Sequence, residues 1–277
     1  MPTVAEKRRT FRALHASGCF VIPNPWDVGS ARYLESLGFK ALATTSSGAA
    51  WSLGRADGEL SLDAMLAHFA ALVEATSLPV NGDFLARFAD DPAGVASNVG
   101  RALATGVAGV SIEDQITGTR DLYDFELAVD RVRAAREAVD AAGGDALLVA
   151  RSECYLTGHP EPLKEAIHRL TAFAEAGADC LYAPGPSTRE DIAAIVKAVA
   201  PKPVNVLARG VDMSVAELAA LGVRRISVGG ALARMAWAGL QRAATEMIGA
   251  GRFTALKDAA PGDPLNALFA EAGKNRL

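Results

Sequence analysis

Eight short apolar runs that alternate with Ala-rich amphipathic segments constrain the fold of this 277-residue chain more than any other feature. The apolar runs are Phe20 to Asn24, Ala41 to Thr45, Pro79 to Phe84, Val110 to Asp114, Leu147 to Ser152, Cys180 to Pro184, Val204 to Ala208 and Ile226 to Gly230. Because parallel strands need a crossover between each pair, the alternation predicts a parallel sheet covered by helices. Eight such units that close on themselves form a (β/α)8 TIM-type barrel.

A doubly wound open sheet is the competing fold. A fold of that kind that binds a dinucleotide typically has a Gly-x-Gly-x-x-Gly turn after its first strand. This chain has Asn24-Pro25-Trp26-Asp27 at that place. No Pro/Ser/Gly-rich linker interrupts the series, so we predict a single domain over residues 1–277, with the barrel at about 19–250 and a tail at 251–277.

The last segment with a helical pattern before the tail is Ala231 to Gly249, which has one apolar face. A Pro-broken tail follows, and its Leu265, Leu268 and Phe269 need a packing partner. Either the outside of the barrel or a neighbouring subunit could provide it, and we expect a homodimer or homotetramer.

Composition narrows the class of partner. The net charge of −4 without a run of like charge argues against nucleic acid or an anionic membrane. No apolar run approaches the roughly 18 to 20 residues of a membrane span, and the polar N-terminus does not resemble a signal peptide, so we expect a cytoplasmic protein. The three scattered cysteines fit reduced thiols and disfavour zinc.

Polar residues stand where the predicted strands end. They are Asn24, Ser46, Ser47, Asn81, Asp83, Glu113, Asp114, Arg151, Ser152, Glu153, Tyr182 and Asn205. In a barrel of this kind the chemistry sits at the carboxyl ends of the strands. One such acid alone often only caps the next helix, but several acids at one mouth imply a cation among them. Oxygen ligands without His or Cys point to Mg²⁺ or Mn²⁺.

Two further features carry candidate chemistry. Arg151 puts a planar guanidinium at the mouth, where it suits a carboxylate or phosphate, unless it serves as a structural partner of Glu113 or Glu153. The small residues Ser46, Ser47 and Gly48 leave backbone N–H groups approachable by an anion, although the stretch also fits an ordinary strand and helix cap.

Asp57 lies between Gly54 and Gly58 in a segment that cannot be helical and is free to move. Of the four histidines, His159 alone lies in a loop that could reach the mouth, and the other three read as surface or packing residues.

Seven motifs together resemble the isocitrate lyase/phosphoenolpyruvate mutase superfamily, in particular its small phosphonomutase-like members. They are Asn-Pro-Trp-Asp-Val-Gly-Ser-Ala-Arg (24–32), Ala-Thr-Thr-Ser-Ser-Gly (43–48), Asp-Gly-Glu-Leu-Ser (57–61), Leu-Pro-Val-Asn-Gly-Asp (78–83), Ser-Ile-Glu-Asp (111–114), Ala-Arg-Ser-Glu (150–153) and Val-Asn-Val-Leu (204–207). The resemblance implies a barrel that binds a Mg²⁺-chelated 2-oxo acid or its enolate. It also implies that the C-terminal helices are exchanged between subunits.

The resemblance also implies roles for single residues. The substrate carboxylate would bind at Ser46, Ser47 and Gly48, and Asn205 would line the pocket, with Trp26 of the first motif as a further substrate-binding residue. Asp57 would lie on the loop that closes over substrate. Asp83 would be the direct metal ligand, Glu113 would support metal-bound water, and Arg151 would steady the oxyanion.

Departures from the superfamily pattern narrow the reaction. The loop at 115–123 lacks the Cys, Lys and His of the tricarboxylate lyases and the Lys gate of the phosphonate mutases, and Pro184 replaces a glutamate. After Asp83, Leu85 stands where the family has a second acid, so we expect weak Mg²⁺ binding that needs substrate, with Arg87 partly pairing with substrate.

These departures favour a Mg²⁺-dependent lyase that cleaves a C–C bond of a small 2-oxo dicarboxylate, such as oxaloacetate or a substituted malate-type acid, through an enolate. Solvent or Arg120 would manage protonation. Two alternatives remain open: a phosphonate enzyme that breaks or moves a P–C bond, and a catalytically weak 2-oxo acid binder.

Overall fold

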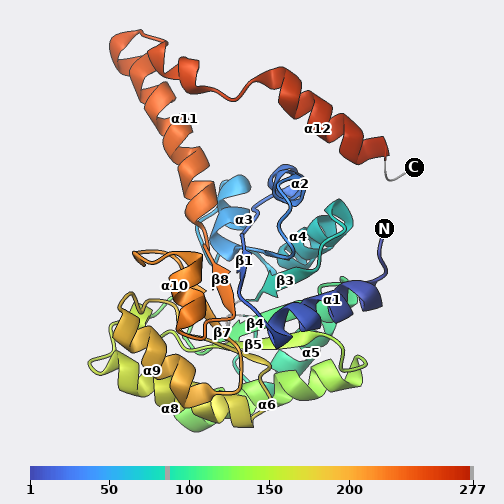
Figure 1. Cartoon of the computed structure of the whole chain (residues 1–277), viewed down its shortest axis with the longest axis vertical. Coiled ribbons are helices and arrows are strands. Elements are labelled where there is room, and N and C mark those ends of the chain that lie inside the picture. Colours follow the sequence, from blue (N-terminus) through green and yellow to red (C-terminus); the bar gives the residue numbers. More distant parts are fainter. Residues whose placement is uncertain (85–87, 275–277) are drawn as a thin grey trace.

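The computed structural model describes residues 1–84 and 88–274 and forms a nearly closed barrel of eight parallel strands (Figure 1). The strands are β1 (Phe20–Ile22), β2 (Leu42–Ala43), β3 (Val80–Asp83), β4 (Gly109–Glu113), β5 (Leu147–Arg151), β6 (Cys180–Tyr182), β7 (Val204–Leu207) and β8 (Arg225–Ser227). Their order in the sheet is β1-β8-β7-β6-β5-β4-β3-β2, and every neighbouring pair is parallel. The prediction of a (β/α)8 barrel is confirmed.

One helix or helix pair follows each strand. The helices are α1 (Val4–Ala16), α2 (Val28–Ser36), α3 (Ser46–Ser52), α4 (Leu62–Ala75), α5 (Pro92–Ala104), α6 (Phe125–Ala141), α7 (Cys154–Thr157), α8 (Pro162–Glu175), α9 (Arg189–Val199), α10 (Val215–Ala220), α11 (Ala231–Ala250) and α12 (Gly262–Lys274), with a 3-10 turn η2 (Thr254–Asp258). Side-chain caps fix several starts; Ser61, for example, accepts the Ala64 N–H. No helix in the described part of the chain combines the length and apolar character needed to cross a membrane.

The barrel closes at a seam between β1 and β2, which share no ladder. The Ala43 N–H donates to the Pro23 carbonyl at 3.1 Å. Asn24 completes the closure, because its Nδ2 donates to the Thr44 carbonyl at 2.9 Å and its Oδ1 accepts the N–H groups of Val228 (3.0 Å) and Gly229 (2.8 Å). The polar end of the first strand is therefore used to join three strands.

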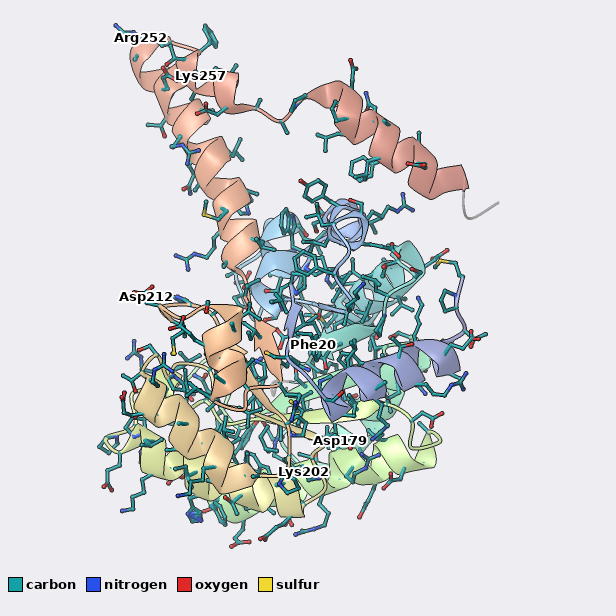
Figure 2. The ribbon with its side chains drawn as sticks, in the orientation of Figure 1. Phe20, Asp179, Lys202, Asp212, Arg252 and Lys257 are labelled. Atoms are coloured by element: carbon teal, nitrogen blue, oxygen red, sulfur yellow. The ribbon has the colours of Figure 1, made fainter. Side chains whose placement is uncertain are left out.

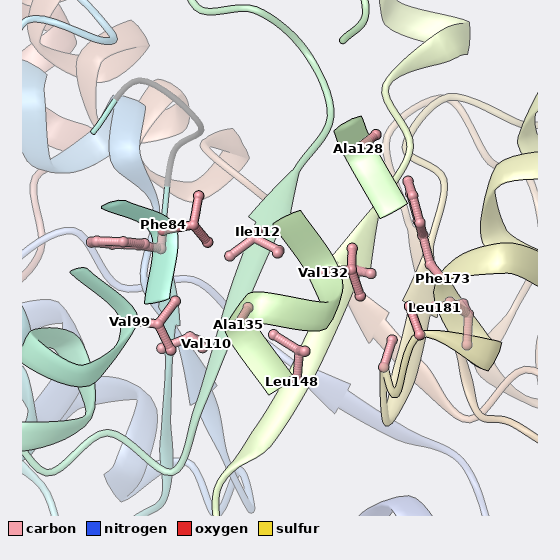
Figure 3. Close-up of a cluster of buried hydrophobic side chains, with 14 of the residues drawn as sticks. Phe84, Val99, Val110, Ile112, Ala128, Val132, Ala135, Leu148, Phe173 and Leu181 are labelled. Carbon is pink, nitrogen blue, oxygen red and sulfur yellow. The ribbon is translucent and has the colours of Figure 1, made fainter. Parts of the chain in front are cut away.

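The main apolar core lies between the strands and the outer helices α5, α6 and α8. Phe84, Ile112, Val132 and Phe173 are at most 4% exposed and meet there (Figure 3). Burial of such side chains contributes about 1.5–3 kcal/mol each relative to exposure. This layer fixes the strands whose ends carry the polar residues.

Helix α1 covers the end of the barrel opposite the mouth. Phe11 is fully buried. The centre of the His15 ring lies 4.6 Å from the centre of the Phe11 ring and 5.1 Å from that of Phe20. Burial lowers the pKa of His15 to about 3, so the ring is neutral. His15 is the packing residue that the sequence predicts.

Helix α11 projects away from the barrel as an arm, and α12 leans back toward α2 (Figure 1). Arg252 and Lys257 mark the tip of this arm, far from Phe20 in the barrel (Figure 2). In the returning tail the Phe269 ring comes within 3.8 Å of the space beside Gly29 of α2. The tail thus packs partly on its own barrel, one of the two partners expected for it.

We expect the protein to sediment as a dimer or tetramer through this arm and not as a 28.8 kDa species. Five large apolar side chains of α11 are exposed: Met235 (68%), Trp237 (42%), Leu240 (56%), Met247 (37%) and Ile248 (89%). A surface of this kind marks a protein interface. The double variant Leu240→Asp/Ile248→Asp should shift the sedimentation profile to the monomer. A wild-type protein that sediments only as a monomer would contradict this prediction.

Candidate functional site

Asp83, at the end of β3, is held rigidly at the mouth. Its backbone N–H donates to Thr44 Oγ1 at 2.8 Å. Its Oδ2 accepts the Ser46 N–H at 3.1 Å, and its Oδ1 accepts from Ser111 Oγ at 3.4 Å and from Arg151 Nη1 at 2.6 Å. The side chain keeps 17% exposure, so the carboxylate is fixed yet reachable from solvent.

Arg151, at the end of β5, is the centre of the constellation. Besides Asp83, its Nε contacts Glu153 Oε1 at 2.7 Å and its Nη2 contacts Glu113 Oε2 at 3.2 Å. The guanidinium carbon lies 5.2 Å from the centre of the Tyr182 ring. One guanidinium therefore joins the ends of β3, β4 and β5.

Burial and charge set the protonation of this group. Burial acts to lower the pKa of Arg151, but Glu153, Glu113 and Asp83 together raise it well above its ordinary value. The pKa of Glu153 is raised, because burial outweighs the opposing charge of Arg151. The arginine is thus a permanent cation surrounded by carboxyl groups.

Asp57 approaches this group from the loop after α3. Desolvation is the largest cause that raises the pKa of Asp57, and the negative charge of Asp83 raises it further. A hydrogen bond with Ser46 acts in the opposite direction. Much of the Asp57 side chain stays exposed. The loop therefore brings a carboxyl group with a raised pKa close enough to Asp83 for the two charges to interact.

The stretch Ser46 to Gly48 forms the first turn of the short helix α3. Ser47 Oγ lies 3.1 Å from Thr45 Oγ1, which also accepts the Gly48 N–H at 3.4 Å. A Cβ at Gly48 would come within 2.7 Å of Thr45 and 2.8 Å of the Cβ of Trp26. Gly48 is therefore required by close packing, and Trp26 lies against this turn.

A cavity of about 370 Å³ adjoins these residues. Ser47, Trp51 and Asp57 line one side of it, and residues at the ends of β7 and β8, including Leu207 and Gly230, line the other. The cavity is large enough to hold a small dicarboxylic acid next to Asp57 and Ser47.

Asn205 lies deeper in the barrel. It is fully buried, its Oδ1 accepts from Arg225 Nε at 2.8 Å, and its Nδ2 donates to Ser227 Oγ at 3.0 Å. The structure thus brings Asp57, Asp83, Glu113, Arg151 and the turn 46–48 together and sets Asn205 beneath them.

The donor set fits a hard divalent cation. The carboxyl groups of Asp57, Asp83, Glu113 and Glu153 face one guanidinium, which leaves negative charge in excess. Among residues 1–84 and 88–274 no group of three or more His, Cys, Asp or Glu is already arranged around one point. Asp83 would bind the ion directly, Glu113 would act through water, and the ion would act as a Lewis acid.

Several supporting residues were not predicted as site residues from the sequence, although Thr44 and Ser111 lie within two of its motifs. Thr44 and Ser111 orient Asp83, and Arg225 is the first residue of β8, just before the apolar run at 226–230. His159 contacts the Glu161 N–H at 3.2 Å within its own loop. Leu85, Ala86 and Arg87, on which the expectations of weak Mg²⁺ binding and substrate pairing rest, lie outside the described residues.

A parallel barrel with an arginine bound by acids at the carboxyl ends of its strands has the features of a (β/α)8 enzyme site. Residues 11–248 match the family described as phosphoenolpyruvate phosphomutase. The chain belongs to this family, within the isocitrate lyase/phosphoenolpyruvate mutase superfamily.

Three similar proteins illustrate the family. The crystal structure of a Burkholderia cenocepacia J2315 protein, provisionally assigned as a lyase/mutase, is 48% identical with a TM-score of 0.91 and covers 96% of both chains. The structure of 2,3-dimethylmalate lyase is 30% identical with a TM-score of 0.83, covering 97% of this chain and 95% of that one. Oxaloacetate decarboxylase of Paraburkholderia xenovorans (strain LB400) is 31% identical over 234 residues, 80% of this chain and 74% of its own.

Proposed function

We propose that this chain is a divalent-metal-dependent lyase that cleaves a C–C bond of a small 2-oxo dicarboxylate through an enolate. The observation that carries the proposal is Arg151, held at the mouth by Asp83, Glu113 and Glu153. A fixed cation there stabilises the negative oxygen that develops when a bond α to a carbonyl breaks. The name of one relative, oxaloacetate decarboxylase, supports a small 2-oxo dicarboxylate, and that of another, 2,3-dimethylmalate lyase, supports a substituted malate-type acid of the same size class.

The residues divide the work between binding and charge stabilisation. The substrate carboxylate binds at the turn Ser46 to Gly48, and Asn205 supports it from below. The longest of the three contacts of Arg151 is the one from its Nη2 to Glu113, at 3.2 Å. That nitrogen is the one we assign to the developing oxyanion, because its present bond costs least to exchange.

Proton transfer falls to Asp57 and solvent. A carboxyl group whose pKa is raised by desolvation and by Asp83 holds a proton closer to neutral pH than an ordinary one does. The loop 115–123 is closed by a bridge between Gln115 and Leu122 and carries no Cys, His or Lys. Decarboxylation or hydrolytic cleavage therefore suits the site better than reversible aldol chemistry, with Arg120 as the one cation of that loop.

A panel of 2-oxo acids with and without Mg²⁺, including a phosphonate substrate, tests the proposal. Metal-dependent release of a C–C cleavage product supports it. Turnover of the phosphonate alone would establish the P–C alternative. Without any turnover, oxalate calorimetry decides, because metal-independent binding would indicate a 2-oxo acid binder.

Asp57→Asn should lower kcat by about 10²-fold or more, which is typical for loss of a general acid or base. The fold should be unaffected, because the side chain is exposed on a loop. Steady-state kinetics and thermal unfolding measure the two effects. Glu59→Gln is the matched control on the same loop, since its remaining oxygen can still accept the Ala56 N–H. Unchanged turnover in Asp57→Asn would remove Asp57 from the mechanism.

A further inference from the structure

Arg225, at the start of β8, is a buried cation inside the barrel. It is 2% exposed, and among the described residues no carboxylate lies within ion-pair distance of it. Its hydrogen bonds go to amide oxygens: Nε donates to Asn205 Oδ1 at 2.8 Å and Nη1 to Asn81 Oδ1 at 3.4 Å. An unneutralised charge in such a place costs folding free energy, so it calls for a reason other than stability.

Nearby titratable side chains do not cancel this charge. Burial raises the pKa of Cys180 to about 11 and that of Tyr182 to about 12, so both stay neutral near pH 7. The ring of His15 is neutral as well. Arg225 itself remains protonated although burial lowers its pKa, because a guanidinium starts from so high a value. Arg225 is therefore a fixed positive charge inside the barrel.

A chain of contacts links Arg225 to the mouth. A guanidinium only donates, so Asn205 must turn its oxygen toward Arg225 and its NH₂ toward Ser227, two residues nearer the carboxyl end of β8. Asn205 also stands opposite Tyr182 in the β6–β7 ladder, and the ring of Tyr182 lies under Arg151. The charge of Asp83 also acts on Arg225.

We infer that Arg225 is a positioning residue of the active site. It fixes the Asn205 amide with its N–H groups directed toward the mouth, and it offsets part of the negative excess of the site carboxylates. The fixed charge favours an anionic ligand above it and disfavours a bare cation. The inference rests on the proposed function, which supplies a dianionic ligand bound together with a metal ion.

The test uses the full-length protein and compares two affinities that the charge of Arg225 should change in opposite directions, that for a bare cation and that for an anionic ligand. Arg225→Met removes the charge, and Asn81→Asp neutralises it by placing a carboxylate beside Nη1. In both variants Mn²⁺ alone should bind about 3- to 10-fold more tightly, and oxalate at saturating Mn²⁺ should bind weaker by a similar factor. Calorimetry measures both affinities, and Asn81→Asp keeps the test open if Arg225→Met does not fold.

Arg225→Lys is the matched control. It keeps the charge but cannot span both amides, so Mn²⁺ affinity should stay at the wild-type value while oxalate affinity falls. A change in melting temperature with both affinities unchanged in Arg225→Met and Asn81→Asp would make Arg225 purely structural and overturn the inference. Failure of the wild-type protein itself to bind oxalate would overturn the proposed function, and this inference with it.

Discussion

Arg151→Met is expected to abolish measurable turnover and to destabilise the fold. Removing the guanidinium leaves Asp83, Glu113 and Glu153 without their shared cation. The site is largely buried, because the Arg151 side chain is only 14% exposed. Breaking a buried pair in this way typically costs about 3–5 kcal/mol. Loss of one oxyanion donor adds a rate loss of about 10²- to 10³-fold. Urea denaturation and steady-state kinetics measure the two effects.

The stability deficit should depend on pH. Without Arg151 the pKa of Glu153, already raised by burial, rises further above its unfolded value. A carboxyl group of this kind stabilises the fold relatively more when protonated, so the stability it contributes is lost as pH rises through its folded pKa. The difference between variant and wild type should therefore be largest at neutral pH and shrink in mild acid.

Arg169→Met provides a matched control for Arg151→Met. Arg169 is equally a buried arginine, paired with Asp114 at 3.3 Å and Glu165 at 2.6 Å, but its ion pairs do not involve Asp83 or Glu113. Its loss should destabilise the fold comparably and leave Mg²⁺-dependent oxalate binding measurable. Equal loss of oxalate binding in both variants would show that the effect of Arg151 is only structural.

The sequence predicted the barrel and the main residues at its mouth, and the reason is physical. Parallel strands buried on both faces read as continuous apolar runs, and polar residues can follow only where those runs end. Asp83, Glu113 and Arg151 stand at such ends, and all three meet in the structure.

The sequence did not predict how deep in the barrel each of these polar side chains lies. The sequence analysis places Asn24 and Asn205 at strand ends as well. In the structure Asn24 follows β1 and closes the seam, but Asn205 is the second residue of β7 and bonds Arg225 beneath the mouth. Which way a side chain is directed depends on pairing register, which a single strand does not specify. Arg225 was not predicted as a site residue, because it stands next to Arg224 and before the apolar run at 226–230 that identifies the strand.

Asp83→Ala is expected to abolish Mg²⁺-dependent binding of oxalate while the protein stays folded. Arg151 would keep Glu113 and Glu153, so no buried charge is left alone. A hard cation holds its site through anionic oxygens, and Asp83 is the ligand we assign to direct contact.

Glu113→Gln should lose only about 10- to 100-fold in the same assay, as is typical for a residue that acts through water. Calorimetry of oxalate at fixed Mg²⁺, with circular dichroism as a check on folding, ranks the two variants. If Asp83→Ala binds oxalate with an undiminished Mg²⁺ requirement, Asp83 is not the metal ligand, and the ion must be held elsewhere at the mouth. The order Asp83→Ala far below Glu113→Gln is therefore the result that assigns the two carboxylates their separate roles.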